Sequence, residues 1–298
     1  MTVLPTLPTT DARAARPGAP DPDGRRISSA RRRWPLTVVE TVAAATVLLI
    51  VVAALAPGLL APRDPLAIDP ASAFQAPSLA HVFGTDDSGR DLYTRVVHGA
   101  GASLLIGIAA TVIGTALGLL LGTAAGIGRR VTDVAVGRLL EVLFALPGLL
   151  LALVIIAFTG PGPIPATIAV GLATAPGYAR IFRTQIRRVR SSEMVEAARV
   201  LGRSPRVLLF RHILPNALAP VLVLATLGVG QAVVWASSLS YLGLGSPPPA
   251  PEWGAMLEAG RTYLGVAWWM TVFPGIAIVL TAASTTVLGR ALTRRAPR

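Results

Sequence analysis

Six long apolar runs dominate the pattern of this chain. They cover residues 36–56, 102–127, 139–158, 164–179, 217–241 and 266–288. Five of these runs contain about 20 residues or more, which is enough for a helix to cross about 30 Å of hydrocarbon. Strands of a membrane barrel would alternate in polarity, whereas these runs are continuously apolar. The pattern therefore predicts an all-α polytopic membrane bundle with six transmembrane helices.

Two of the runs leave an alternative open. The fourth run is short and contains prolines at 165 and 176, so a re-entrant segment competes with a full span. The first run could belong to a signal peptide, because residues 54–56 read Ala-Leu-Ala and resemble a cleavage site. A retained anchor is favoured, since the run exceeds a usual signal-peptide core and further spans follow it.

The segments between the runs complete the expected organisation. Residues 1–33 are rich in Pro, Ala, Asp and Arg without apolar periodicity, which predicts a disordered cytoplasmic tail. A first transmembrane helix over 36–60 and an external segment over 61–100 follow. A five-helix core over 101–290 then contains an inner loop at 180–215, and residues 291–298 form a second cytoplasmic tail.

The basic residues predict the orientation of the spans. All 27 are arginine, and 23 of them fall in the segments assigned to the inner side. The other four are Arg63, Arg90, Arg95 and Arg261. Positive charge favours the cytoplasmic side, so both termini are expected there. Orientation and contact with anionic lipid also explain the net charge of +12. No basic stripe with interleaved aromatic residues remains, so nucleic acid is not an expected partner.

The composition excludes several kinds of chemistry. The chain has no cysteine and no lysine, which excludes thiolate catalysis and a Walker A loop. Its three histidines are scattered, so no metal site, cofactor or catalytic residue is expected. Only Glu40 and Glu141 are ionisable within the runs, and snorkelling or an arginine partner explains both. A secondary transporter or channel, or an intramembrane enzyme, is a weaker alternative because charges at membrane depth are missing.

Glycine and proline positions indicate how the helices pack and bend. Glycines recur every fourth residue in the second run, at Gly114, Gly118, Gly122 and Gly126. This spacing places them on one helix face, where a neighbouring backbone can approach closely. Proline–glycine pairs at 147–148, 176–177 and 274–275 permit kinks. Such breaks line a transport pathway in some transporters and are simple bends in other bundles, and both interpretations stay open.

The loop at 180–215 predicts two short helices joined at a glycine. Ser192 is placed to cap the first helix, and Gly202 suits the residue just past its end. Ser204 with Pro205 starts the second helix, which Leu214 and Pro215 are expected to end. An apolar stripe of Met194, Ala197 or Ala198, and Leu201 is expected on the first helix. The pair fits a docking element for another protein or an amphipathic connector on the lipid surface.

These loop residues resemble a known motif. Glu196-Ala197-Ala198, followed by Gly202 and then Leu214-Pro215, is similar to the EAA loop of binding-protein-dependent ABC importer permeases, although His212 replaces an expected isoleucine. The run RHILPN at 211–216 resembles the dipeptide/oligopeptide/nickel subfamily. The stretches 83–100 and 239–261 resemble its C-type permease. The end of the chain, 285–298, lacks the acidic residues usual in that subfamily.

The resemblance implies a multi-pass permease subunit of the bacterial inner membrane with no catalysis of its own. It implies four kinds of partner: a second homologous permease, two cytoplasmic ATP-binding subunits, an extracytoplasmic solute-binding protein and membrane lipid. The solute would be a dipeptide, an oligopeptide or a similar small solute, with nickel left open. ATPase coupling is assigned by the resemblance to Glu193, Glu196, Ala197, Ala198, Leu201, Gly202, Leu214 and Pro215. Contact with the binding protein, or a gate, is assigned to Gly84, Thr85, Asp86, Gly89, Arg90 and Asp91.

Overall fold

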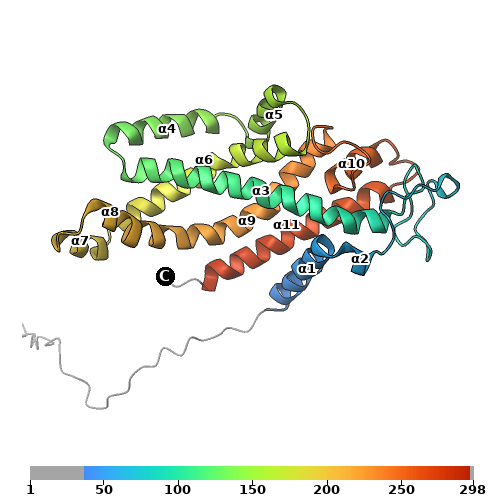
Figure 1. Cartoon of the computed structure of the whole chain (residues 1–298), viewed down its shortest axis with the longest axis horizontal. Coiled ribbons are helices and arrows are strands. Elements are labelled where there is room, and N and C mark those ends of the chain that lie inside the picture. The colour runs from blue at the N-terminus through green and yellow to red at the C-terminus, as the bar shows by residue number, and fades with distance from the viewer. Residues whose placement is uncertain (1–36, 296–298) are drawn as a thin grey trace, which may run out of the picture. The chain divides into compact units, whose positions relative to one another are not determined.

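The computed structural model of the chain describes residues 37–295, apart from the side chains of residues 219, 220, 222 and 295. The tail expected at 1–33 and the last three residues of the tail at 291–298 lie outside the described residues. Every regular element in the described range is helical, and the one β-bridge there joins Thr85 to Asp91 (Figure 1). The all-α prediction is therefore confirmed.

The helices follow one another with short connections, apart from the segment between α2 and α3. Their bounds are α1 Val38–Leu55, α2 Pro57–Leu60, η1 Pro70–Ser72, α3 Leu92–Ile127, α4 Arg130–Phe144, α5 Gly148–Thr159, α6 Pro163–Arg190, α7 Glu193–Val200, α8 Pro205–Val207, the π-helix η2 Leu208–Ile213, α9 Leu214–Tyr241, α10 Trp253–Arg261 and α11 Trp269–Arg295.

Four helices of the described chain are long and apolar enough to cross a membrane. They are α1, α3, the Val223–Tyr241 part of α9, and α11, and a fifth span results if α4 and α5 are counted together. Helix α6 has 28 residues, but five arginines between Arg180 and Arg190 make its second half polar. The prediction of six spans therefore stays a prediction.

The third predicted span, 139–158, is wrong as a continuous helix. Helices α4 and α5 meet there at 91°. Pro147 precedes α5 with φ −53° and ψ 135°, and a proline cannot donate the hydrogen bond that would continue α4. Pro176 and Pro274, in contrast, lie inside the uninterrupted helices α6 and α11. The fourth run is the first half of α6 and does not reverse, so the re-entrant alternative is wrong.

Helix α3 packs along α6, and α9 and α11 run beside them (Figure 1). The four glycines of α3 are buried on the face that meets α6. A Cβ atom added at any of them would lie 2.4–2.6 Å from an α6 side chain. The four side chains are themselves spaced four residues apart and are Thr174, Tyr178, Phe182 and Ile186. The two helices thus approach each other along about three turns.

Three apolar clusters hold the bundle together. One surrounds Trp253 and Trp269 and joins α1, α3, α10 and α11. A second surrounds Val170 and joins α3, α5, α6 and α9. The third contains Ile186 and Val195 and fixes α7 to the ends of its neighbours. Helices α7 and α8 therefore form one end of the bundle, and α10 with the segment before α3 lies near the other (Figure 1).

Both glutamates that the sequence places within spans have an arginine partner. Glu40 is buried in the first turn of α1, and its Oε1 atom lies 2.9 Å from a terminal guanidinium nitrogen of Arg294 on α11. Glu141 lies 2.9 Å from Arg138 on the exposed surface of α4. The first pair connects two helices far apart in the sequence, whereas the second joins residues three apart on one helix.

Candidate functional site

Helix α7 begins and ends where the sequence predicts. Ser192 has the extended backbone of an N-cap residue, with φ −78° and ψ 149°. Gly202 has a φ of +72°. Its N–H donates to the carbonyl of Arg199 at 3.0 Å, and the N–H of Arg203 donates to the carbonyl of Ala198 at 3.2 Å. These two bonds form a Schellman motif, which requires the left-handed conformation that glycine adopts most easily. The turn after α7 is thus fixed by local chemistry.

The side chain of Ser192 does not cap the helix, which corrects the sequence prediction. Its Oγ donates to the carbonyl of Val189 at 2.7 Å instead. Ser204 does cap the next short helix, because its Oγ accepts from the N–H of Val207 at 3.5 Å and Pro205 occupies the first position. One of the two predicted serine caps is therefore wrong.

The buried face of α7 differs from the predicted stripe. Val195 is fully buried and packs with Ala198 against Ile186, Leu208 and Ile213, which belong to α6 and η2. Met194 and Leu201 are exposed, so the buried side of this short helix is centred on Val195 and Ala198 and not on the predicted stripe. Six exposed residues are defined here as the α7 face: Glu193, Met194, Glu196, Ala197, Val200 and Leu201; Arg199 is exposed as well and is not counted among them. Val200 is 83% and Leu201 77% exposed, so this apolar and acidic face is not covered by other described residues.

The chain does not leave the helical conformation at Leu214 and Pro215, which corrects a further prediction. The π-helix η2 continues directly into α9, and the N–H of Leu214 donates to the carbonyl of Leu209 five residues earlier. Pro215 therefore lies in the first turn of α9, where a missing N–H is tolerated. Because η2 packs on α7, the α7 face is attached to α9 without a flexible joint.

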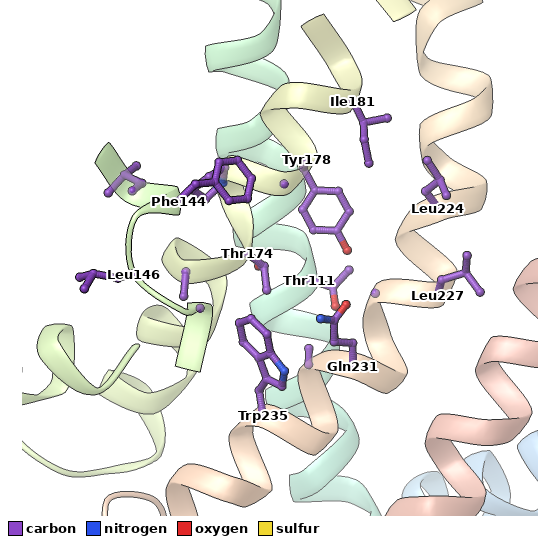
Figure 2. Close-up of a pocket in the computed structure, with 17 residues that line it drawn as sticks. Thr111, Phe144, Leu146, Thr174, Tyr178, Ile181, Leu224, Leu227, Gln231 and Trp235 are labelled. Atoms are coloured by element: carbon purple, nitrogen blue, oxygen red, sulfur yellow. The ribbon is translucent and has the colours of Figure 1, made fainter. Parts of the chain in front are cut away.

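A cavity of about 400 Å³ lies between α3, the α4–α5 break, α6 and α9 (Figure 2). Its walls are mainly apolar, and no charged side chain lines it within residues 37–295. Figure 2 shows Thr111, Tyr178 and Gln231 pointing toward one another at its centre, with Thr174 and Trp235 nearby. The arrangement offers hydroxyl and amide groups to a neutral hydrogen-bonding ligand.

Glycines make room for the two large polar side chains of the cavity. A Cβ atom at Gly148 would lie 2.2 Å from the indole of Trp235, and one at Gly228 would lie 1.7 Å from the hydroxyl oxygen of Tyr178. Two of the three proline–glycine pairs contribute Gly148, Pro176 and Gly177 to the lining, whereas the pair at 274–275 does not. The sequence reasoning missed the cavity itself. Gln231, the one amide in the run 217–241, was the available signal.

The turn at 84–91 lies at the opposite end from α7, and most of its side chains are used internally. The hydroxyl of Thr85 donates to the carbonyl of Ser72 and accepts from the N–H of Gln75 at 2.8 Å. The carboxylate of Asp86 accepts the N–H groups of Ser88 and Arg90, each at 2.9 Å. Thr85 and Asp86 are both buried. The turn is thus built into the fold and is not a projecting loop.

Two glycines and two charged residues complete this turn. Gly84 and Gly89 have φ values of +77° and +75°, and a Cβ atom at Gly89 would lie 1.7 Å from the carbonyl oxygen of Asp69. Arg90 lies 3.3 Å from Asp86. Asp91 begins α3 by accepting the N–H of Thr94 at 2.9 Å. Contact with a binding protein stays a prediction for these residues, and their burial favours a supporting role.

Hydrogen bonding keeps the carboxyl group of Asp91 ionised. Burial opposes ionisation, but hydrogen bonds from Thr94 and from the His81 ring, whose Nδ1 lies at 2.9 Å, outweigh it, so the pKa of Asp91 lies below its usual range. Because the pKa of Asp91 is lower in the folded state, the ionised carboxylate stabilises the folded chain at any pH above its unfolded-state pKa. This contribution is lost as the pH falls through the folded-state pKa. The start of α3 is therefore stable at neutral pH.

Several known proteins are similar to this chain in sequence. The family model described as "Binding-protein-dependent transport system inner membrane component" matches residues 98–297. The dipeptide transport system permease protein DppC of Alkalihalophilus pseudofirmus is 40% identical over 75% of this chain and 74% of its own length. The di/tripeptide transport system permease protein DppC of Pseudomonas aeruginosa is 39% identical over 82% of this chain and 83% of its own length. A probable D,D-dipeptide transport system permease protein, DdpC of Escherichia coli, is 38% identical over 89% of both chains.

Solved structures agree in fold. A chain of the inward-facing MetNI methionine ABC transporter superposes with a TM-score of 0.57, at 20% identity, over 70% of this chain and 98% of its own length. A chain of an amino acid ABC transporter, crystallised with histidines, superposes with a TM-score of 0.54. It is 16% identical in sequence and is matched over 68% of this chain and 95% of its own length. The family match covers the region that contains the cavity, the α7 face and the helices between them. This chain belongs to the family of binding-protein-dependent transport system inner membrane components.

Proposed function

We propose that this chain is the permease subunit of an ATP-driven importer of dipeptides or oligopeptides and forms half of the translocation pathway. The names of the similar proteins from A. pseudofirmus, P. aeruginosa and E. coli support the peptide solute. Its partners would be a second homologous permease, two ATP-binding subunits and a solute-binding protein.

The observation that carries this proposal is the α7 face. Val195 and Ala198 hold α7 from behind, while Glu193, Glu196 and Leu201 remain uncovered in front. An apolar surface flanked by carboxylates suits a groove with basic groups at its rim. ATP hydrolysis belongs to the partner that docks there, because this chain has no lysine for a Walker A loop.

The proposed orientation places α7 and both termini in the cytoplasm. Nine arginines between Arg180 and Arg211 lie on or next to the α7 end of the bundle, as the positive-inside rule requires. In this orientation α6 provides the sixth span, and the turn at 84–91 lies outside. Because Thr85 and Asp86 are buried, the turn would act as a rigid support for a gate or for the binding-protein contact.

The cavity is the proposed contribution to the solute pathway. Thr111, Tyr178 and Gln231 can form hydrogen bonds with the peptide groups that all peptides share. The walls carry no charge, so they would not select peptides by a charged side chain. Helix α6 connects the two sites, since it carries Tyr178 in the cavity and Ile186 against α7. Movement of a docked ATPase would therefore reach the cavity through one helix.

Removing the amide of Gln231 tests this pathway. We expect Gln231→Leu to lower peptide uptake roughly tenfold by raising the apparent KM, because the loss of one hydrogen bond to the solute costs about 1–1.5 kcal/mol. Uptake of a labelled peptide into proteoliposomes that contain the whole importer gives the KM. The matched control is Ser238→Ala on the same helix, whose hydroxyl donates to the carbonyl of Val234 outside the cavity. An equal effect of both changes would contradict the assignment.

The experiment that tests the proposed function is co-purification from the native membrane in mild detergent. The expected result is recovery of a second permease of this family and of one or two ATPases with Walker motifs. Recovery of this chain alone, where a control importer stays intact, would contradict the proposal and would favour a self-contained transporter or channel.

A further inference from the structure

A second cavity, lined by arginines, lies at the α7 end of the bundle. It has a volume of about 470 Å³ and lies between the end of α3, the start of α4, the end of α6, and α7. Its charged side chains are Arg130, Arg187, Arg190, Arg199 and Asp133. We call it the arginine cleft. Four positive groups face a single carboxylate, so the cleft carries a surplus of positive charge.

The contacts within the cleft leave two of these arginines uncompensated. The carboxylate of Asp133 is bound by Arg187 and also by Arg183, whose Nε lies 2.7 Å from Oδ1. Arg190 donates to the carbonyl of Gly126 at 3.3 Å. Among the described residues, Arg130 on α4 and Arg199 on α7 have neither an ion pair nor a side-chain hydrogen bond. Both remain available to an anion that enters between them.

The helix ends at the cleft also favour an anion. Helix α4 begins at Arg130, and the side chain of the preceding Arg129 makes no cap bond, so N–H groups of the first turn remain open. The carbonyl end of α3 would oppose an anion, but Arg190 covers the carbonyl of Gly126. Small residues at 125, 126 and 128 leave space beside the backbone. The cleft therefore combines side-chain charge with an open helix N-terminus.

The position of the cleft indicates where this anion comes from. The apolar span of α3 ends at Ile127, next to the cleft, which places the cleft at the boundary between hydrocarbon and headgroups. Val131, 79% exposed, and Val134 lie on α4 just beyond Arg130. Apolar side chains in hydrocarbon with an arginine at the polar boundary are typical of a lipid contact. A lipid phosphate is thus favoured over a soluble anion.

We propose that the arginine cleft binds the phosphate headgroup of an anionic phospholipid. Arg130 and Arg199 supply the uncompensated charge that binds the phosphate, and Arg187 and Arg190 line the same cleft. Because Arg199 belongs to α7 and Arg130 to α4, a lipid bound by both would fix the position of α7 relative to α4 and the membrane surface. This site does not depend on peptide transport, since lipid binding can be measured on the chain without its partners.

Phosphatidylglycerol, phosphatidylcholine and inorganic phosphate are the probes that test the site. The purified full-length chain is titrated in detergent with each probe, and native mass spectrometry counts the retained molecules. Wild-type protein is expected to hold phosphatidylglycerol in preference to phosphatidylcholine. The double variant Arg130→Gln/Arg199→Gln should bind phosphatidylglycerol roughly 30-fold more weakly, as expected for two arginine contacts at a membrane surface.

Two further double variants serve as controls. Arg188→Gln/Arg290→Gln removes the same charge from exposed positions outside the cleft and should keep the wild-type affinity. Arg130→Lys/Arg199→Lys retains the charge and should recover most of the binding, and an unchanged thermal unfolding midpoint of the glutamine pair would show that this pair is folded. Equal loss in both glutamine pairs would overturn the proposal, because it would reduce the effect to net charge.

Two other outcomes would also overturn the proposal. If inorganic phosphate displaced phosphatidylglycerol at equal concentration, the site would be one for a soluble anion. If Arg130→Gln/Arg199→Gln kept its phosphatidylglycerol in this titration but lost the ATPase during co-purification from the native membrane, the cleft would bind an acidic protein surface.

Discussion

Replacing Gly118 with alanine should destabilise the folded chain by roughly 1–3 kcal/mol, although the change adds only one methyl group. The new Cβ atom would lie 2.4 Å from the Cβ of Tyr178 and 2.9 Å from the backbone nitrogen of Ala179. A backbone atom in a packed helix cannot rotate away, so α3 and α6 have to separate. The thermal unfolding midpoint of the detergent-purified chain measures the effect, and Gly118→Leu should prevent accumulation of folded protein.

Gly137→Ala is the matched control and should act in the opposite direction. This glycine also lies inside a helix, α4, but the nearest atoms to an added Cβ are those of the Arg183 guanidinium at 3.8 Å. Alanine favours the helix over glycine by about 1 kcal/mol, so the midpoint should stay the same or rise. If Gly118→Ala behaved like Gly137→Ala, the close approach of α3 to α6 would be contradicted.

The sequence predicted the glycine face but not the helix that meets it. Four glycines at a spacing of four identify a face whatever lies opposite, because the spacing depends only on helix geometry. Of the partner side chains on α6, Thr174 and Tyr178 come from a run that shows no such glycine spacing, and Phe182 and Ile186 come from the segment that the sequence analysis assigned to a loop. Long-range pairing of this kind is decided by the whole bundle.

Prolines limited the prediction of the spans. Pro147 separates α4 from α5 at 91°, whereas Pro176 and Pro274 lie within continuous helices. All three occur as proline–glycine pairs in apolar runs, so local chemistry alone does not distinguish them. Neighbouring helices can satisfy the backbone carbonyl that a proline leaves free, and this compensation is tertiary.

The α7 region shows the same division between local and tertiary information. The positive φ of Gly202 and the cap by Ser204 follow from local chemistry and could be predicted. The buried side of α7 could not be predicted, because on an eight-residue helix either of two adjacent apolar residues, Met194 or Val195, can face the core. Contacts with Ile186 and Leu208, from α6 and η2, select Val195 over Met194. The cavity was missed for a related reason, since its polar groups come from separate helices.

Reversing the charge of Glu196 should abolish peptide uptake while leaving the permease folded in the membrane. Glu196 lies on the exposed α7 face, so Glu196→Lys does not disturb Val195 or Ala198 beneath it. In the proposed complex, Glu196 faces basic groups of a docked ATPase, so a lysine there would replace attraction with repulsion. Disrupting a close charge pair at an interface typically costs about 2–5 kcal/mol. We expect uptake to fall roughly 100-fold, with loss of ATPase during co-purification.

The matched control for this prediction is Glu141→Lys, which reverses another exposed glutamate. Glu141 contacts Arg138 on its own helix α4 and lies away from the α7 face, so uptake and ATPase retention should stay near wild type. Gly202→Asp should resemble Glu196→Lys, because it strains the left-handed turn that ends α7 and adds a charge beside it. Normal uptake by Glu196→Lys, with the ATPase still bound, would show that α7 does not transmit ATPase movement. The route from Ile186 along α6 to Tyr178 would then have no input.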